Sequence, residues 1–314
     1  MKKKCNLVIG STGFIGGNVC KNISKKYDLY TISRKRKKNI FSKKHFVINL
    51  KNYQNLNKVI LELKKNYKKI DVFFLAGESS VEKSISNSKL SINNSIISFH
   101  NTILALRNVK STIIFASSGS VYDSRVKSSF LEKDIVRPPS PYAAIKHASE
   151  GIAISYCDTY GMDIRIARIF SVFGETMNRF FIYDLVKKLN NSKDKVLLKG
   201  SGNQERDYLH VDDVSNGLFT ILKNGSKGEI YNLCSGKPIK LKSLAEKIKI
   251  ILKKSNVKIF WDNKKTEGVR ESWYGDNRKI KLIGFNCKKL FSKCLESTIH
   301  YIFLNLKKMN KTKN

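Results

Sequence analysis

The glycines Gly10, Gly13 and Gly16 stand between a short apolar run, residues 7–9, and a helical pattern that begins near Ile15. Behind a buried strand, such a turn lets backbone N–H groups and the start of a helix approach a pyrophosphate, because glycine has no side chain to block the ligand. A glycine turn without a ligand is the alternative. The strand–turn–helix placement favours a dinucleotide-binding unit.

The first half of the chain then alternates between strands and helices. Apolar runs at 29–33, 46–48, 71–76, 112–116 and 163–170 are separated by helical patterns at 15–24, 53–67, 90–107 and 142–160. Buried strands that alternate with helices are typical of a parallel sheet covered on both faces. The sequence therefore predicts an α/β fold with a doubly wound parallel sheet of the Rossmann type.

After residue 170 the alternation of strands and helices becomes less regular. The sequence predicts helices at 181–189, 211–222 and 241–253, strands at 196–199, 229–233 and 257–261, and a basic helix over 288–307. We expect residues 1–170 to form the dinucleotide-binding domain, with segments near 208–236 returning to it. Residues 171–314 are expected to form a smaller α/β domain that binds the substrate.

The net charge of +35 raises the possibility of a nucleic-acid or membrane-surface binder. No basic–aromatic module accompanies it, so we expect a solvated surface that attracts anionic substrates, and no nucleic-acid partner. The 6 cysteines form no Cys-x-x-Cys pair, which indicates reduced thiols and no metal site. The apolar run behind the first lysines is too short for a secretion signal, and no run is long enough to span a membrane, so a cytoplasmic protein is expected.

A second pattern joins Tyr142 and Lys146, four residues apart on one predicted helix, with Ser118 just after a predicted strand. Residues four apart share a helix face, so the phenol and the ammonium can point into one cleft. The ammonium is expected to lower the tyrosine pKa from its usual value of about 10. A tyrosine tuned in this way can exchange a proton with a sugar hydroxyl while a hydride moves at the same carbon.

The end of the second predicted strand bears on the type of cofactor. A free 2′-hydroxyl is usually held by an acid about 20 residues after the glycines, whereas a 2′-phosphate needs a cation. Ser33 and Arg34 stand there, and no carboxylate does. This favours NADP(H) over NAD(H), although Arg34 as an ordinary surface cation is the alternative.

These motifs resemble the extended short-chain dehydrogenase/reductases, the NAD-dependent epimerase/dehydratase group that modifies nucleotide sugars. The resemblance covers nearly the whole chain and includes the glycine spacing, Ser118 placed 24 residues before Tyr142, the Tyr-x-x-x-Lys pair, and the segments 206–213, 231–236 and 273–277. It implies that Ser118 binds the reacting sugar oxygen, that Tyr142 is the acid/base, and that Lys146 holds the nicotinamide ribose.

The resemblance also implies contacts of Arg206 and Arg270 with the nucleotide diphosphate. An ion pair of Arg206 with Asp212 or Asp213 is the alternative, while both aspartates suit the cap of the next helix. The expected cofactor contacts are Gly10, Gly13, Phe14, Ile15, Gly16, Ser33, Arg34, Asn49, Leu75, Ala76, Gly77, Asn94, Tyr142 and Lys146, and the expected substrate contacts are Ser79, Ser118, Arg206 and Arg270.

Gly119 and Ser120 stand where the related dehydratases carry an acid, often an Asp-Glu pair. With dehydration disfavoured, the reaction that remains is oxidation or reduction at one carbon of the sugar, which we expect to be C4. The first hypothesis is a 4-ketoreductase that uses NADPH; a 4-epimerase with tightly bound NAD is the close alternative, and a non-catalytic nucleotide- or RNA-binding protein is a third. The resemblance further implies a homodimer built from helices 90–107 and 142–160.

Overall fold

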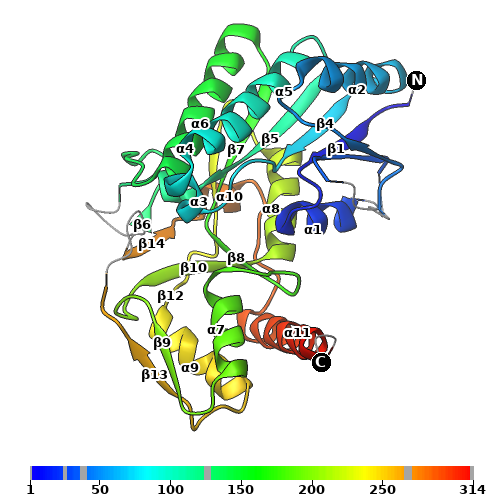
Figure 1. The fold of residues 1–314 in the computed structure, drawn as a ribbon. Coiled ribbons are helices and arrows are strands. Elements are labelled where there is room, and N and C mark those ends of the chain that lie inside the picture. Colours follow the sequence, from blue (N-terminus) through cyan, green and yellow to red (C-terminus); the bar gives the residue numbers. More distant parts are fainter. Residues whose placement is uncertain (1, 24–26, 36–40, 124–128, 265–270, 312–314) are drawn as a thin grey trace.

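A seven-stranded parallel sheet forms the centre of the larger part of the molecule (Figure 1). The structure is a computed structural model and describes residues 2–23, 27–35, 41–123, 129–264 and 271–311. The strand order is β11-β7-β5-β4-β1-β2-β3, and each neighbouring pair is parallel. The strands are β1 (Cys5–Ile9), β2 (Leu29–Ser33), β3 (Lys44–Val47), β4 (Ile70–Phe74), β5 (Ser111–Ser118), β7 (Asp163–Ile169) and β11 (Ile230–Leu233). The predicted Rossmann-type sheet is confirmed.

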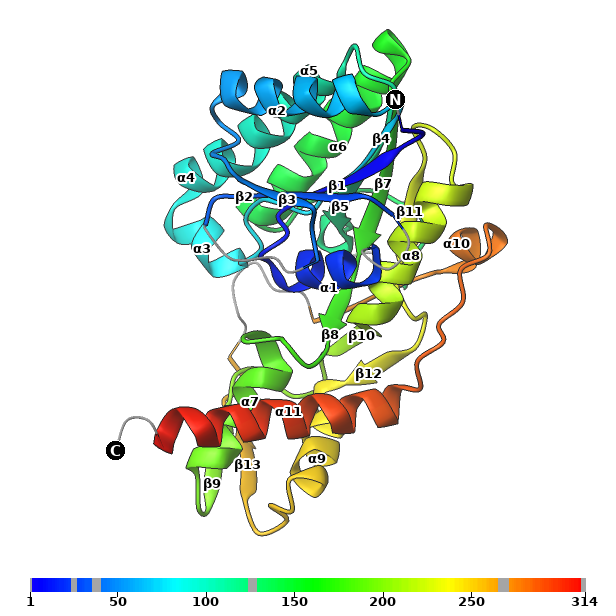
Figure 2. The same ribbon diagram turned by 90° about the vertical axis from the view of Figure 1, so that its right-hand side faces the viewer.

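Helices cover both faces of this sheet, which is why its central strands are rich in buried apolar residues. One face packs against α2 (Tyr53–Asn66), α5 (Ser98–Leu106) and α6 (Pro141–Tyr160). The other packs against α1 (Phe14–Ile23), α8 (Val211–Asn224) and α10 (Arg278–Leu282), as Figure 2 shows from the side. Every residue of β1 and of β4 is buried.

The region predicted as a single helix over 90–107 is more complex. It consists of α4 (Ser88–Ile92), a π-helical segment (Asn93–Ile97) and α5, and a short helix that was not predicted, α3 (Val81–Ser86), precedes it. The π segment shifts the helix face by one residue, so Phe99 is buried in the core while Ile92 and Ile97 are each 42% exposed. The large apolar side chains of this region therefore lie partly in the core and partly on the surface.

The smaller part of the molecule lies below the sheet in Figure 1 and has a core of its own. Three helices surround that core together with a two-stranded sheet: α7 (Phe180–Asn191), α9 (Leu241–Ile251), α11 (Phe291–Lys311), β9 (Lys195–Leu198) and β13 (Lys258–Trp261). Helix α11 lies along this part in Figure 2.

A second small sheet lies between the two parts. It contains β6 (Ser129–Phe130), β8 (Ser171–Phe173), β10 (Glu205–His210), β12 (Pro238–Lys240) and β14 (Ser272–Gly275). The sequence did not predict these strands, because they are short and their partners lie far away in the chain. We propose a division near residue 170, with 208–236 returning to the larger domain, since β11 completes the parallel sheet beside β7.

Among the described residues, none of the helices combines the length and the apolar character that a membrane crossing requires.

Candidate active site

A cavity of about 1010 Å³ opens between the two parts of the molecule, at the carboxyl ends of the parallel strands. Ligands of doubly wound sheets bind at this edge. All the predicted site residues that the structure describes line this cavity; Arg270 lies outside the described residues. They are Gly10, Gly13, Phe14, Ile15, Gly16, Ser33, Arg34, Asn49, Leu75, Ala76, Gly77, Ser79, Asn94, Ser118, Tyr142, Lys146 and Arg206.

The glycine turn has the close backbone packing that a dinucleotide site needs. Gly10 has a φ of +91°, and a Cβ there would lie 2.7 Å from the backbone nitrogen of Ala76. A Cβ on Gly16 would clash with the carbonyl of Gly10. Helix α1 begins at Phe14, so its first N–H groups, which have no partner within the helix, lie at the cavity. These residues fit the pyrophosphate of a dinucleotide.

Tyr142, Ser118 and Lys146 all line this cavity. Helix α6 begins at Pro141, directly before the tyrosine, and Ser140 caps it by accepting a hydrogen bond from the Ala143 N–H at 3.3 Å. The Tyr142 hydroxyl and Ser118 form a hydrogen bond. The end of β5 and the start of α6 thus bring Ser118 to the same cavity as Tyr142 and Lys146, which follow it by more than 20 residues in the chain.

The predicted influence of Lys146 on Tyr142 is wrong for this structure. Burial raises the pKa of Tyr142, and the hydrogen bond from Ser118 and the charge of Arg179 offset this in part. The Lys146 ammonium donates instead to the Ala116 carbonyl at 2.7 Å. Burial lowers the pKa of Lys146 to about 8, with the Glu150 charge acting in the opposite direction.

A buried ion pair holds α6, the helix that carries Tyr142 and Lys146, against the sheet. Arg168 on β7 makes two hydrogen bonds to the Glu150 carboxylate on α6, at 2.9 and 2.8 Å, and Ser117 on β5 donates to the same carboxylate. Ser117 precedes Ser118, and Glu150 lies one turn after Lys146. The pair therefore fixes the two elements that carry Ser118, Tyr142 and Lys146, and the sequence alone did not reveal it.

The space beside Gly119 is filled. A Cβ on Gly119 would lie 2.6 Å from the ring of Phe170, which is buried. Ser120 donates to the Ser118 hydroxyl oxygen at 3.0 Å. At Gly119, the first of the two positions where related dehydratases carry an acid, a side chain would therefore clash with Phe170.

The adenosine end of the predicted cofactor site is basic. Arg34 is exposed and lines the cavity, and so do Ser33 and Asn49. The chain contains no aspartate or glutamate from residue 29 to residue 61. No carboxylate from this region can therefore bind a ribose 2′-hydroxyl.

Arg206 on β10 is buried and lines the cavity. Its guanidinium donates to the carbonyls of Glu205 and Glu271, at 2.7 and 2.8 Å, and lies 5.9 Å from the ring centre of Trp273. Burial lowers its pKa. Its side chain is therefore held by backbone carbonyl groups at the wall of the cavity.

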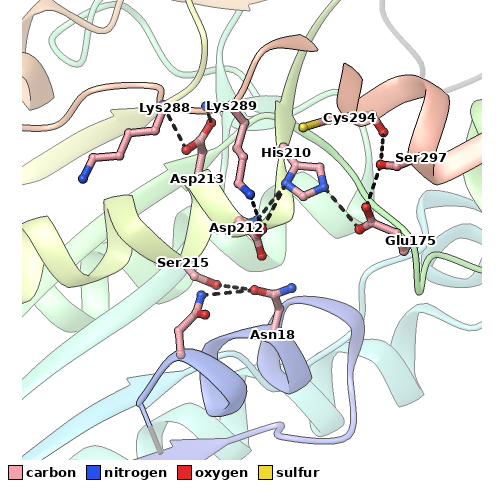
Figure 3. A network of polar contacts seen from close by, with 11 residues as sticks. Asn18, Glu175, His210, Asp212, Asp213, Ser215, Lys288, Lys289, Cys294 and Ser297 are labelled. Carbon is pink, nitrogen blue, oxygen red and sulfur yellow. Dashed lines mark hydrogen bonds and ion pairs between the residues drawn. The ribbon is translucent and has the colours of Figure 1, made fainter. Parts of the chain in front are cut away.

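The two aspartates that follow β10 have other roles than those predicted (Figure 3). Asp212 pairs with Lys289 at 3.1 Å, and the Asp213 carboxylate accepts the backbone N–H groups of Lys288 and Lys289. The N-cap of α8 is His210, whose ring accepts from the Asp212 N–H. Both aspartates lie in the first helical turn, where their charge suits the helix dipole.

The same network connects the two domains. Figure 3 shows His210 between Asp212 and Glu175, and Glu175 accepts a hydrogen bond at 2.8 Å from Ser297 on α11. The hydrogen bond from His210 lowers the pKa of Glu175 to about 2. A separate contact joins Ser215 on α8 to Asn18 on α1, at 3.0 Å.

Sequence reasoning missed Arg179 and Glu78. Arg179, the N-cap residue of α7, donates from Nη2 to the Ser79 hydroxyl oxygen at 2.7 Å, across 100 residues of sequence. Glu78 also lines the cavity, and its charge raises the pKa of Tyr142. The only sequence signal for Arg179 was the scarcity of arginine beside lysine in this chain.

The described residues contain no cluster of three or more His, Cys, Asp or Glu side chains that could hold a metal ion.

Comparisons with known proteins agree with the fold and the motifs. A UDP-glucuronate 4-epimerase from Thermodesulfobacterium geofontis is 26% identical over 94% of this chain and 95% of that protein. An uncharacterized protein from Methanocaldococcus jannaschii is 30% identical over 97% of this chain and 98% of its own length. The structure of a UDP-N-acetylglucosamine 4-epimerase from Methanobrevibacter ruminantium, 22% identical, shares the fold with a TM-score of 0.85, over 97% of this chain and 100% of that one. Since the model of the family matches residues 6–234, this chain belongs to the NAD dependent epimerase/dehydratase family, the extended short-chain dehydrogenase/reductases.

Proposed function

We propose that this protein is a nucleotide-sugar 4-epimerase. The observation that carries the proposal is the meeting of Ser118, Tyr142 and Lys146 in the cavity, beside a glycine turn that fits a dinucleotide. The sequence alone ranked 4-keto reduction first. Similarity to a UDP-glucuronate 4-epimerase over almost the full length of both chains moves epimerisation ahead.

The residues have separate roles in this proposal. The glycine turn would hold the pyrophosphate of a dinucleotide, and its nicotinamide would supply the hydride chemistry at C4. Ser118 binds the C4 oxygen, and Tyr142 accepts and returns its proton. Lys146 holds the cofactor ribose, and Arg206 binds the substrate's diphosphate on the opposite wall. The sugar rotates between the two transfers, so its C4 configuration inverts.

The lack of space at Gly119 supports chemistry at a single carbon. A dehydratase needs a further acid to remove the C5 proton and expel the C6 hydroxyl, and Phe170 occupies the space that such a side chain would need. The intact proton-transfer set also argues against a non-catalytic nucleotide- or RNA-binding protein, which has no use for it.

A second candidate is a 4-ketoreductase that uses NADPH. The basic end of β2 favours it, because Arg34 lines the cavity and no acid lies between residues 29 and 61. The reductase consumes one NADPH per turnover, whereas the epimerase regenerates its cofactor.

Mass spectrometry of the purified protein separates the candidates. Retained NAD, and interconversion of a nucleotide-sugar pair without added cofactor, would support the epimerase. A site without retained cofactor, and NADPH consumption with a 4-keto nucleotide sugar, would support the reductase.

The Tyr142→Phe variant tests the proton-transfer role common to both. We expect turnover to fall by at least ~10²-fold while affinity for the nucleotide sugar is nearly unchanged. Tyr160→Phe, on the same helix but outside the cavity, is the matched control and should turn over normally. Near-normal turnover of Tyr142→Phe would refute the assignment.

A further inference from the structure

The segment between β8 and α7, residues 174–179, forms part of the cavity wall. Met177 and Arg179 line the cavity, and so does Phe180 at the start of α7. The same segment leads the chain from the small sheet between the two parts of the molecule into the smaller part. Its position therefore helps to determine the shape of the cavity.

Glu175 anchors this segment from two sides, as Figure 3 shows. Ser297 on α11 donates to Oε1 at 2.8 Å, and Nε2 of His210 lies 3.3 Å from Oε2. Helix α11 packs into the core of the smaller part, whereas His210 caps α8, which packs against the parallel sheet. One carboxylate thus holds the segment to both parts of the molecule.

The contact between Glu175 and His210 needs no charge on the imidazole ring. Nδ1 of His210 accepts the backbone N–H of Asp212 at 3.3 Å, so the hydrogen of a neutral ring lies on Nε2, which faces Glu175. The hydrogen bond from His210 lowers the pKa of Glu175 to about 2, so its carboxylate is ionised at neutral pH and accepts only. Donor and acceptor therefore match.

Close backbone packing brings Glu175 within reach of this ring. Phe173, the last residue of β8, is paired in register with His210 on β10. A Cβ on Gly174 would lie 2.6 Å from Cγ1 of Val211 and 3.4 Å from Nε2 of His210. Gly174 thus lets the segment pass directly over the start of α8.

The segment has little other polar anchorage. Within the part of the chain that the structure describes, the one further side-chain hydrogen bond from residues 174–179 to another residue joins Arg179 to Ser79, at 2.7 Å. Both of these residues are exposed, whereas His210 is only 5% exposed. Arg179 also makes no side-chain cap bond at the start of α7. The contacts of Glu175 are therefore the principal polar restraint on this wall.

We propose that Glu175 is a positioning residue of the substrate site. It does not line the cavity itself, but its contacts with His210 and Ser297 hold Met177 and Arg179 where they form the wall. This inference rests on the proposed nucleotide-sugar site and adds a residue outside the cavity that shapes it.

Calorimetric titration of the cofactor-loaded protein with UDP-glucuronic acid and UDP-glucose tests the proposal. We expect Glu175→Ala to weaken binding of the UDP sugar by about 3- to 10-fold, because the segment loses both hydrogen bonds. Ser297→Ala should give a smaller loss, since His210 still holds the carboxylate. Glu175→Gln should stay within about 2-fold of the wild type, because its amide oxygen can accept from Nε2 of His210.

A second measurement separates positioning of this wall from a general effect on the fold. Native mass spectrometry should show the same cofactor occupancy in the wild type and in Glu175→Ala, either retained on purification or taken up from added NADPH. Glu246→Ala is the matched control, since Glu246 pairs with Lys249 on the exposed side of α9, outside the cavity, and it should change neither readout.

Unchanged sugar affinity in Glu175→Ala would overturn the proposal. So would a parallel loss of cofactor occupancy, which indicates a general structural role, or a Glu175→Gln variant as weak as Glu175→Ala, which excludes the hydrogen-bond acceptor role. Failure of the proposed function would be seen in the wild type instead: a protein that takes up cofactor but binds neither UDP sugar, nor GDP-mannose, would not have a nucleotide-sugar site.

Discussion

The Glu150–Arg168 ion pair gives the sharpest stability prediction, with Glu150→Gln as the test. Glu150 and Arg168 are 1% and 3% exposed, and two hydrogen bonds join them. After the substitution the guanidinium stays buried, with the Glu132 carbonyl at 3.1 Å and the face of the Tyr122 ring as its remaining contacts outside position 150.

Breaking a buried pair by removing one charge costs roughly 3–5 kcal/mol. Because the glutamine oxygen can still accept one hydrogen bond from Arg168, we expect the lower end, about 3 kcal/mol, which is a large part of the ~5–15 kcal/mol typical of a folded protein. Urea unfolding followed by circular dichroism measures it. The double variant Glu150→Met/Arg168→Met should lose less than Glu150→Gln, because it leaves no unpaired charge.

The effect should also depend on pH. Burial by itself raises the pKa of the Glu150 carboxyl, but hydrogen bonds from His147 and Arg168, with the Arg168 charge, outweigh it and lower the pKa overall. A lowered carboxyl pKa contributes stability that is complete above the unfolded value of about 4.3 and is lost as the pH falls through the folded value. A difference between wild type and Glu150→Gln below about 1 kcal/mol at pH 7, or one that does not shrink toward pH 3, would refute this reasoning.

Three further predictions concern packing, cofactor and assembly. Gly119→Ala should lower the free energy of unfolding by about 1–3 kcal/mol, because its Cβ would overpack against a buried ring. Gly151→Ala on α6, where the Cβ meets open space, should raise it by about 0.5–1 kcal/mol. Urea unfolding compares the two variants, and equal shifts would contradict the packing argument. Arg34→Ala should weaken NADPH by about 1–3 kcal/mol and NADH hardly at all, and equal losses in a fluorescence titration would make Arg34 a bystander. We expect light scattering of the wild type to give about twice the 35.9 kDa chain mass. Ile97→Lys should be monomeric, whereas Leu282→Lys, at a position that is 87% exposed and outside the proposed interface, should stay dimeric. A monomeric wild type would refute the dimer.

Local sequence was sufficient to predict those features that a single segment of the chain determines. The glycine turn needs only a strand, three glycines and a helix in succession, and Tyr142 and Lys146 share a face because they are four residues apart. The strands of the parallel sheet were readable because helices cover both faces and leave apolar runs. The sequence by itself therefore determined the fold class and the expected set of cavity residues.

Tertiary structure decided the features that depend on distant partners. The charges that act on Tyr142 differ from those that the sequence predicted. Lys146 donates to a carbonyl on β5, and the charge of Arg179, from the smaller part of the molecule, contributes to the pKa of Tyr142. Strand β6 pairs with β14, which lies more than a hundred residues later in the chain, and β14 pairs in turn with β10. Burial and electrostatic interactions act through space rather than along the chain, so no local pattern could reveal which charge reaches Tyr142 or that Phe170 fills the space beside Gly119.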